Sequence, residues 1–261
     1  MQSHHNEGPL LSNNVFKRFF EHFGRIVLML TGIIRKPENK RVYWKEFMEQ
    51  CEDIGIRTLP IVLIISFFMG AVFSVQTAYK LTSPLIPKYI IASIVRDGAI
   101  LELSPTVLCV VLAGVIGSKI TAQLGNLRMS EQIDALEIMG INTRTFLVLP
   151  RIVAAVLLIP CLIVISIFIS IIGGYVSCVL THIVTPQQYY QGLIYEFIPY
   201  DVFFAMVKAF FYALIITIIP CYYGYYAEGG ALAIGRATTK AVITCCILIV
   251  IVDYLLSVLL L

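Results

Sequence analysis

Residues 152–181 read IVAAVLLIPCLIVISIFISIIGGYVSCVLT, and none of these 30 side chains carries a charge. About 20 apolar residues in a helix are enough to cross the hydrocarbon core of a bilayer, so this stretch predicts a membrane span. Residues 58–79 are also uncharged and predict a second span. The composition agrees, since 59% of the 261 residues are hydrophobic and only 13% are charged. One water-soluble core cannot bury so large an apolar share, and we expect an all-α integral membrane protein.

Three further apolar stretches, each with one charged residue, bring the expected number of spans to five. They are 98–118 with Glu102, 202–227 with Lys208 and 241–261 with Asp253. Lys208 and Asp253 each lie about eight residues inside the outer end of their span, which is ~12 Å at the helical rise. Equal depth and opposite charge predict a buried ion pair. Such a pair either fixes the packing of two spans or takes part in proton coupling.

Basic residues accumulate on the cytoplasmic side of short loops, and their distribution gives the expected orientation. Fifteen lysines and arginines fall before the first predicted span, around residue 130 and before the last span. The opposite side has Lys80 and Lys88 in its first loop and none between His182 and Tyr200. We therefore expect a multi-pass inner-membrane protein whose N-terminus is cytoplasmic and whose C-terminus lies at the outer face.

Residues 1–57 are expected to form a cytoplasmic tail with an amphipathic helix at the membrane interface, ahead of a transmembrane domain at 58–261. The apolar residues of this helix recur at helical spacing with charges between them. They are Phe16, Phe19, Phe20, Phe23, Val27 and Leu30. Residues 26–34 could dip into the membrane as a re-entrant turn but are too few to cross it.

The loop between the second and third spans contains a charged helix. Within GSKITAQLGNLRMSEQIDALEIMGI, residues 117–141, Ser130 is suited to cap the start of a short helix and Gly140 to end it. Glu131 and Asp134 suit the positive end of its dipole. A helix of this kind at about 120–142 is either a handle for a soluble partner or a solvated loop helix.

The sequence offers no catalytic constellation, no metal-ligand spacing and no phosphate-binding loop. We expect neither an enzyme nor a cofactor on this chain, so any ATP and magnesium would be bound by another one. Its seven cysteines, an odd number found mostly in apolar spans, are expected to be buried free thiols. A secondary transporter of a small amphipathic solute remains an alternative, although the chain shows no inverted repeat.

Three separated motifs resemble the MlaE (YrbE) family of ABC-transporter permeases. They are the Glu-Gln-Ile-Asp-Ala-Leu-Glu block at 131–137, the Pro-Arg pair at 150–151 and the Gly-Gly…Gly-x-Ala-Thr-Thr-x-Ala-Val block at 229–242. The likeness extends from about Trp44 to the end of the chain. It implies a homodimeric permease that moves phospholipids between the inner and outer membranes. The implied partners are a second copy of the chain, a cytoplasmic ABC ATPase, a periplasmic MCE-domain protein and phospholipid, with no nucleic acid.

The resemblance also implies roles for particular residues. Those expected to dock to the ATPase are Glu131, Gln132, Ile133, Asp134, Leu136 and Glu137. Glu102, Leu103 and Pro105 match a family segment, Arg-Glu-Leu-x-Pro, that borders the lipid cavity. Leu101 replaces the arginine of that segment, and Arg96 is expected either to substitute for it as a lipid-binding cation or to pair with Glu102.

The chain departs from the family pattern at three further positions. An arginine is replaced by Val115, an acidic residue by Gln123, and a second arginine by Tyr223. Lys119 is expected to replace one of the missing cations. These changes suggest a divergent branch with altered lipid choice.

Overall fold

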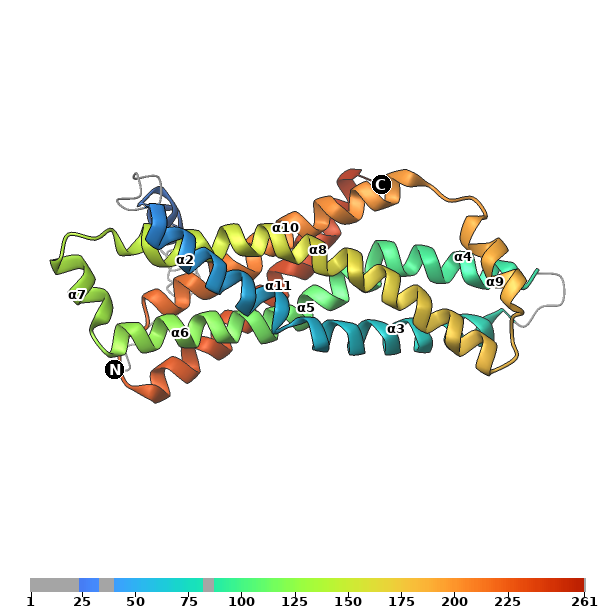
Figure 1. Ribbon diagram of the computed structural model, residues 1–261, viewed down its shortest axis with the longest axis horizontal. Coiled ribbons are helices and arrows are strands. Elements are labelled where there is room, and N and C mark those ends of the chain that lie inside the picture. Colours follow the sequence, from blue (N-terminus) through green and yellow to red (C-terminus); the bar gives the residue numbers. More distant parts are fainter. Residues whose placement is uncertain (1–23, 33–39, 82–86, 261) are drawn as a thin grey trace, which may run out of the picture.

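The computed structural model describes residues 24–32, 40–81 and 87–260, and every regular element in those ranges is a helix (Figure 1). Five helical runs are long and apolar enough to cross a membrane. They are Tyr43–Lys80, Tyr89–Met129, Thr143–Leu180, Pro199–Tyr225 and Ala231–Leu260. The predicted all-α fold with five spans is therefore confirmed, and each run begins before the apolar stretch that predicted it.

The first run joins α2 (Lys40–Cys51), the π-helix η1 (Glu52–Ile56) and α3 (Leu59–Lys80), with two residues between η1 and α3. The expected boundary at residue 57 thus falls inside a nearly continuous helical run. Residues 24–32 form a short helix whose Met29 is fully buried in the main core. Most of the predicted interfacial helix, 16–23, lies outside the described residues, as does the end of the predicted re-entrant turn.

The second run changes helix type along its length. It consists of α4 (Tyr89–Gly98), π-helix η2 (Ala99–Val107), α5 (Leu108–Leu112), π-helix η3 (Ala113–Gly117) and α6 (Ser118–Met129). Pro105 lies inside η2 and has no amide hydrogen to donate to a carbonyl in the preceding turn. π-helical turns inside a helix are frequent at functional sites, and η2 carries Glu102.

The helix in the loop is shorter than predicted and begins differently. α7 covers Gln132–Ile138, whereas residues 120–129 belong to α6 and continue the second span. Ser130 does not cap α7: its hydroxyl donates to the carbonyl of Asn126 at the end of α6. The chain turns instead at Glu131, which has a left-handed φ of 57°. Gly140 ends α7 as predicted, because its φ of 81° allows amide hydrogen bonds from residues 140 and 141 back to Glu137 and Leu136.

The third span, α8 (Thr143–Leu180), packs closely along α3. Gly70 and Gly173 make this approach possible, since a Cβ at either position would overlap a backbone carbonyl of the facing helix. Across the same interface the hydroxyl groups of Ser66 and Ser166 lie 2.7 Å apart. α3 and α8 therefore form one rigid pair.

Two more spans complete the bundle. They are α10 (Pro199–Tyr225) and α11 (Ala231–Leu260), which pack on each other. The short helix α9 (Pro186–Ile194) packs on α4. Figure 1 shows α7 at one end of the long axis and α9 at the other, which we call the α7 end and the α9 end. The start of α10 and the end of α11 lie part-way along the molecule, where the hydroxyl of Tyr200 donates to the carbonyl of Leu260. α3, α4 and α8 extend past them toward the α9 end.

Candidate functional site

The charged centre of the bundle is Lys208 on α10, whose side chain has no exposed surface. Its Nζ lies 2.6 Å from Asp253 Oδ1 on α11 and 3.2 Å from Glu102 Oε1 on η2. Nζ also lies 3.1 Å from the carbonyl oxygen of Leu101 and 4.7 Å from the ring centre of Phe204. The predicted contact between Lys208 and Asp253 is present, and Glu102 joins it as a second carboxylate that the prediction of a pair did not include.

Pro105 lies in the same π-helix as Glu102 and is buried. Because π-helical hydrogen bonds run to the fifth residue back, Pro105 leaves the carbonyl of Ile100 without its helical donor. The neighbouring carbonyl of Leu101 accepts a hydrogen bond from Lys208 Nζ. Pro105 therefore interrupts the backbone hydrogen bonds of η2 next to the residue that Lys208 contacts.

Hydroxyl groups complete the environment of Asp253. Its Oδ1 accepts from Tyr212 at 2.8 Å and from Thr106 at 3.1 Å. Both residues are neighbours of the charged pair, Tyr212 on α10 and Thr106 on η2. The cluster thus holds one ammonium group and two carboxylates. Several donors converge on the carboxylate of Asp253, and together they stabilise its charge away from water.

Glu102 and Leu103 face the surface of the bundle. The Glu102 side chain is 53% exposed although its carboxylate touches buried Lys208. Leu103 lines an open groove of about 300 Å3 with five residues of α3. These are Phe68, Met69, Val72, Phe73 and Gln76. Leu103, which lines the apolar groove, thus directly follows the half-exposed Glu102 in the chain.

Arg96 contacts the end of α9 rather than Glu102. Its side chain is 4% exposed and its Nε lies 2.8 Å from Asp97 Oδ1. Its Nη1 donates to the carbonyl of Leu193, in the last turn of α9, at 2.7 Å and to that of Tyr195, just after α9, at 2.9 Å. The basic partner of Glu102 is Lys208 instead. Arg96 joins α4 to the end of α9, and the alternative pairing of Arg96 with Glu102 is not formed, while its role as a lipid-binding cation stays a prediction.

The α7 end divides the predicted docking residues into two groups. Ile133 is fully buried in the main core and cannot contact a partner. Asp134 lies 2.5 Å from Arg128 on α6, and Glu137 accepts hydrogen bonds from Thr143 and Tyr225. Glu131, Gln132 and Glu137 are exposed, and Asp134 and Leu136 are partly buried.

Two strongly exposed apolar residues at the end of α7 were not among the predicted docking residues. Ile138 is 88% exposed and Met139 is 65% exposed, at the tip of α7. Hydrophobic side chains presented to solvent in this way are typical of a protein interface. The sequence shows only that Ile133 and Ile138, five residues apart, lie on different faces of a helix, and the packing of the bundle decides which face is buried.

Two of the departures from the family pattern take part in local contacts. Gln123 Nε2 donates to Asp53 Oδ2 at 3.2 Å, and Lys119 Nζ lies 2.8 Å from Asp53 Oδ1. Tyr223 approaches Thr244 with 3.5 Å between their hydroxyl oxygens. Lys119 therefore holds α6 to η1. In the ranges that the structure covers, no three histidine, cysteine or acidic side chains gather as a metal site.

The sequence of this helical bundle matches the model of one protein family. A family model described as Permease MlaE matches residues 47–259, nearly the whole helical bundle. The chain belongs to the MlaE permease family. The resemblance seen in the three sequence motifs is thereby confirmed.

Individual relatives of this MlaE permease agree with the family model. A "Probable ABC transporter permease protein" of Rickettsia bellii is 36% identical over 228 residues, which are 87% of this chain and 86% of the relative. A protein of the same description from Rickettsia felis is 35% identical over 254 residues, 95% and 96% of the two chains. "Protein TRIGALACTOSYLDIACYLGLYCEROL 1, chloroplastic" of Arabidopsis thaliana is 28% identical over 217 residues, 83% of this chain and 62% of that protein.

Family membership identifies the chain as the multi-pass permease of an ABC transporter, a transport subunit and not an enzyme. An ABC permease works with an ATPase, so the exposed tip of α7 in the MlaE permease gains a candidate partner. Membership of this family argues against the alternative of a secondary transporter.

Proposed function

We propose that this permease moves phospholipids between the inner and outer membranes of a bacterium, as a homodimer with two ATPase subunits and an MCE-domain protein. The observation that carries the lipid assignment is the groove at Leu103. An apolar groove in a membrane helix bundle suits acyl chains, and the half-exposed Glu102 beside it, with Lys208 behind, suits a polar head group. The Arabidopsis thaliana relative is also named after a diacylglycerol lipid.

In this proposal ATP and magnesium are bound by the ATPase, and this chain supplies the passage for the lipid. The basic α7 end faces the cytoplasm, the α9 end faces the periplasm, and the chain resides in the inner membrane. ATPase closure displaces α7, and the spans carry that movement to the groove. Residues 1–57 form the cytoplasmic and interfacial part, and 58–261 the transmembrane part.

A photo-crosslinking experiment tests the lipid site. A photoreactive amino acid replaces Val72, which lines the groove, and a second protein carries it at Ile247 on α11, which is similarly exposed. Leu103→Arg is expected to reduce phospholipid crosslinking at position 72 and to leave crosslinking at position 247 unchanged. Equal crosslinking at position 72 with and without the substitution would remove the groove from the lipid path.

Co-purification in mild detergent tests the ATPase interface. Ile138→Asp with Met139→Asp is expected to abolish recovery of the ATPase with the tagged chain. A matched control carries Tyr190→Asp and Ile194→Asp, two exposed apolar residues of α9 at the opposite end. Loss of ATPase from the control, or its retention by the α7 variant, would contradict the proposed docking surface.

A further inference from the structure

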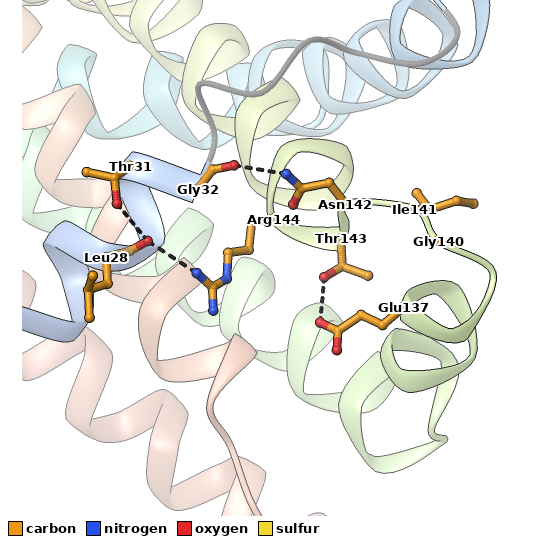
Figure 2. A pocket seen from close by; sticks show the side chains of 9 residues that line it. All are labelled: Leu28, Thr31, Gly32, Glu137, Gly140, Ile141, Asn142, Thr143 and Arg144. Atoms are coloured by element: carbon orange, nitrogen blue, oxygen red, sulfur yellow. Dashed lines mark hydrogen bonds between the residues drawn. The ribbon is translucent and has the colours of Figure 1, made fainter.

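A single carboxylate joins three helices at the α7 end. Glu137 Oε1 accepts a hydrogen bond from Thr143 at the start of α8 at 2.9 Å and from Tyr225 at the end of α10 at 2.8 Å. The two hydroxyl oxygens lie 2.8 Å from each other. Figure 2 shows Glu137 pointing from α7 toward Thr143. α7 is thereby linked to α10 through two residues, Glu137 and Tyr225, that are 88 positions apart in the sequence.

The link is a charged one. The hydrogen bond from Tyr225 is the main reason that the pKa of Glu137 is lowered from its ordinary value, and the hydrogen bond from Thr143 acts in the same direction. Glu137 is thus ionised at neutral pH. Hydrogen bonds to an ionised acceptor are shorter and stronger than those between neutral groups.

α7 has few other ties to the bundle. It is seven residues long and lies between two turns with positive φ, at Glu131 and Gly140. Its remaining anchors in the described structure are buried Ile133 and the ion pair of Asp134 with Arg128. A force applied to the exposed tip is therefore passed on through a small number of named contacts.

Of these contacts, the one with Tyr225 leads to the charged centre of the membrane region. α10 runs as one helix from Pro199 to Tyr225, through Pro220, and carries Lys208. Tyr225 and Lys208 are 17 residues apart, ~25 Å at the helical rise. A shift of α10 along or about its axis changes the position of Lys208 relative to Glu102 on η2.

The start of α8 is held on its other side by the helix at 24–32. Asn142 Nδ2 donates to the carbonyl of Gly32 at 2.9 Å, and Arg144 Nη1 donates to that of Leu28 at 3.2 Å, as Figure 2 shows. These contacts hold the beginning of α8 against the N-terminal helix. α10 is therefore the element that a displacement of Glu137 can move without also moving the N-terminal helix.

We propose that Glu137 and Tyr225 form the joint through which α7 positions Lys208, so that movement of α7 is converted into a change at the charged centre. Both are positioning residues, since neither touches the groove. The inference rests on the proposed function, because it takes the ATPase as the source of the force on α7. It goes beyond that function by naming α10 and one hydroxyl as the route.

The test uses the full complex reconstituted in phospholipid vesicles. Tyr225→Phe removes the hydroxyl and retains the ring. Tyr226→Phe is the matched control, because this neighbouring ring packs against Tyr225 while its hydroxyl makes no hydrogen bond in the described part of the chain. Glu137→Ala removes the acceptor, and Glu137→Gln keeps an oxygen that can accept.

Two readouts separate a joint from a merely structural role. Tyr225→Phe and Glu137→Ala are expected to retain ATP hydrolysis and to lower phospholipid transfer by about 5-fold or more, the lower limit for coupled sites. Glu137→Gln is expected to rescue transfer, and the double variant of Glu137→Ala with Tyr225→Phe to be no worse than either single variant. Transfer by Tyr225→Phe at the level of Tyr226→Phe overturns the proposal.

Hydrogen exchange in the same complexes gives the second readout. A non-hydrolysable ATP analogue is expected to change deuterium uptake in peptides of α7 and of α10 around Lys208, and Tyr225→Phe is expected to abolish the change in α10 alone. A change in α10 that survives Tyr225→Phe overturns the joint. If the wild-type complex transfers no phospholipid, the lipid assignment fails, while hydrogen exchange still decides whether α7 acts on α10.

Discussion

The ammonium group of Lys208 lies 2.6 Å from the carboxylate of Asp253, and the two residues come from different spans. Removing both charges from water is costly, and the hydroxyl groups of Tyr212 and Thr106 and the carbonyl of Leu101 offset part of that cost. Because Glu102 is the more exposed of the two carboxylates, its contact with Lys208 is the one that can change while the pair with Asp253 stays intact. Within one cluster, Lys208 therefore has a more buried contact, with Asp253, and a more exposed contact, with Glu102.

Replacement of Lys208 by methionine should destabilise the bundle strongly, because it leaves Asp253 without its cation. Breaking a buried pair in this way typically costs ~3–5 kcal/mol. Thermal unfolding can be followed with a thiol-reactive dye, since several free cysteines are buried. Adding Asp253→Asn should restore part of the loss, and Lys240→Met, at an exposed position of α11, should have little effect. Equal unfolding temperatures for Lys208→Met and the wild type would show that the pair contributes nothing.

Alanine at Gly70 should disrupt the packing of α3 on α8. The added methyl group would overlap the backbone of Ser170, which cannot rotate away as a side chain could. Overpacking of this kind typically costs ~1–3 kcal/mol. Gly114→Ala is the matched control, because nothing lies within 4 Å of its added Cβ. The measurement is the yield and unfolding temperature of the purified variants, and a Gly70→Ala protein as stable as Gly114→Ala would contradict the close approach.

Lysine at Arg96 should loosen the α9 end while leaving the rest of the bundle folded. The single ammonium group of a lysine cannot reproduce the contacts of the forked guanidinium group, which bonds both Asp97 and the carbonyls at the end of α9. We expect faster proteolysis of the segment 182–198, measured by mass spectrometry of the fragments. Lys88→Arg, at an exposed position before α4, provides the control. Unchanged proteolysis in Arg96→Lys would mean that packing alone holds α9.

The contribution of Glu137 to stability should depend on pH. Its folded-state pKa is lowered below the ordinary value of 4.5, mainly by the hydrogen bond from Tyr225. A lowered carboxyl pKa contributes stability above the unfolded-state value and loses it as the pH falls through the folded-state value. The wild type should therefore exceed Glu137→Gln in unfolding temperature at neutral pH, and the difference should shrink below about pH 4.5.

The same comparison with Glu131→Gln serves as the control for this pH dependence. Glu131 is exposed and adjoins α7, and in the described residues its side chain makes no hydrogen bond. That variant should follow the wild type across the pH range. A difference between Glu137→Gln and the wild type that stays constant with pH would contradict the ionised joint.

Sequence reasoning found the pairing of Lys208 with Asp253 because depth along a helix follows from residue count alone. It missed Glu102 as a partner of Lys208 because that contact depends on the rotation of η2. A π-helix has more residues per turn than an α-helix, so side chains after Gly98 point in directions that α-helical spacing does not predict. The contacts of Arg96 could not be predicted for a related reason, since the carbonyls that it contacts are about 100 residues away in the chain.

The sequence by itself determined the membrane class, the five spans, the end of α7 at Gly140 and membership of the MlaE family, because hydropathy, turn preference and family motifs are properties of continuous segments. Only the tertiary structure decided that Ile133 is buried while Ile138 is exposed, that Glu137 joins α7 to α10, and that Lys208 has two carboxylates as partners. Each of these depends on how neighbouring helices are rotated and aligned against one another, and residues distant in sequence set that arrangement when they pack.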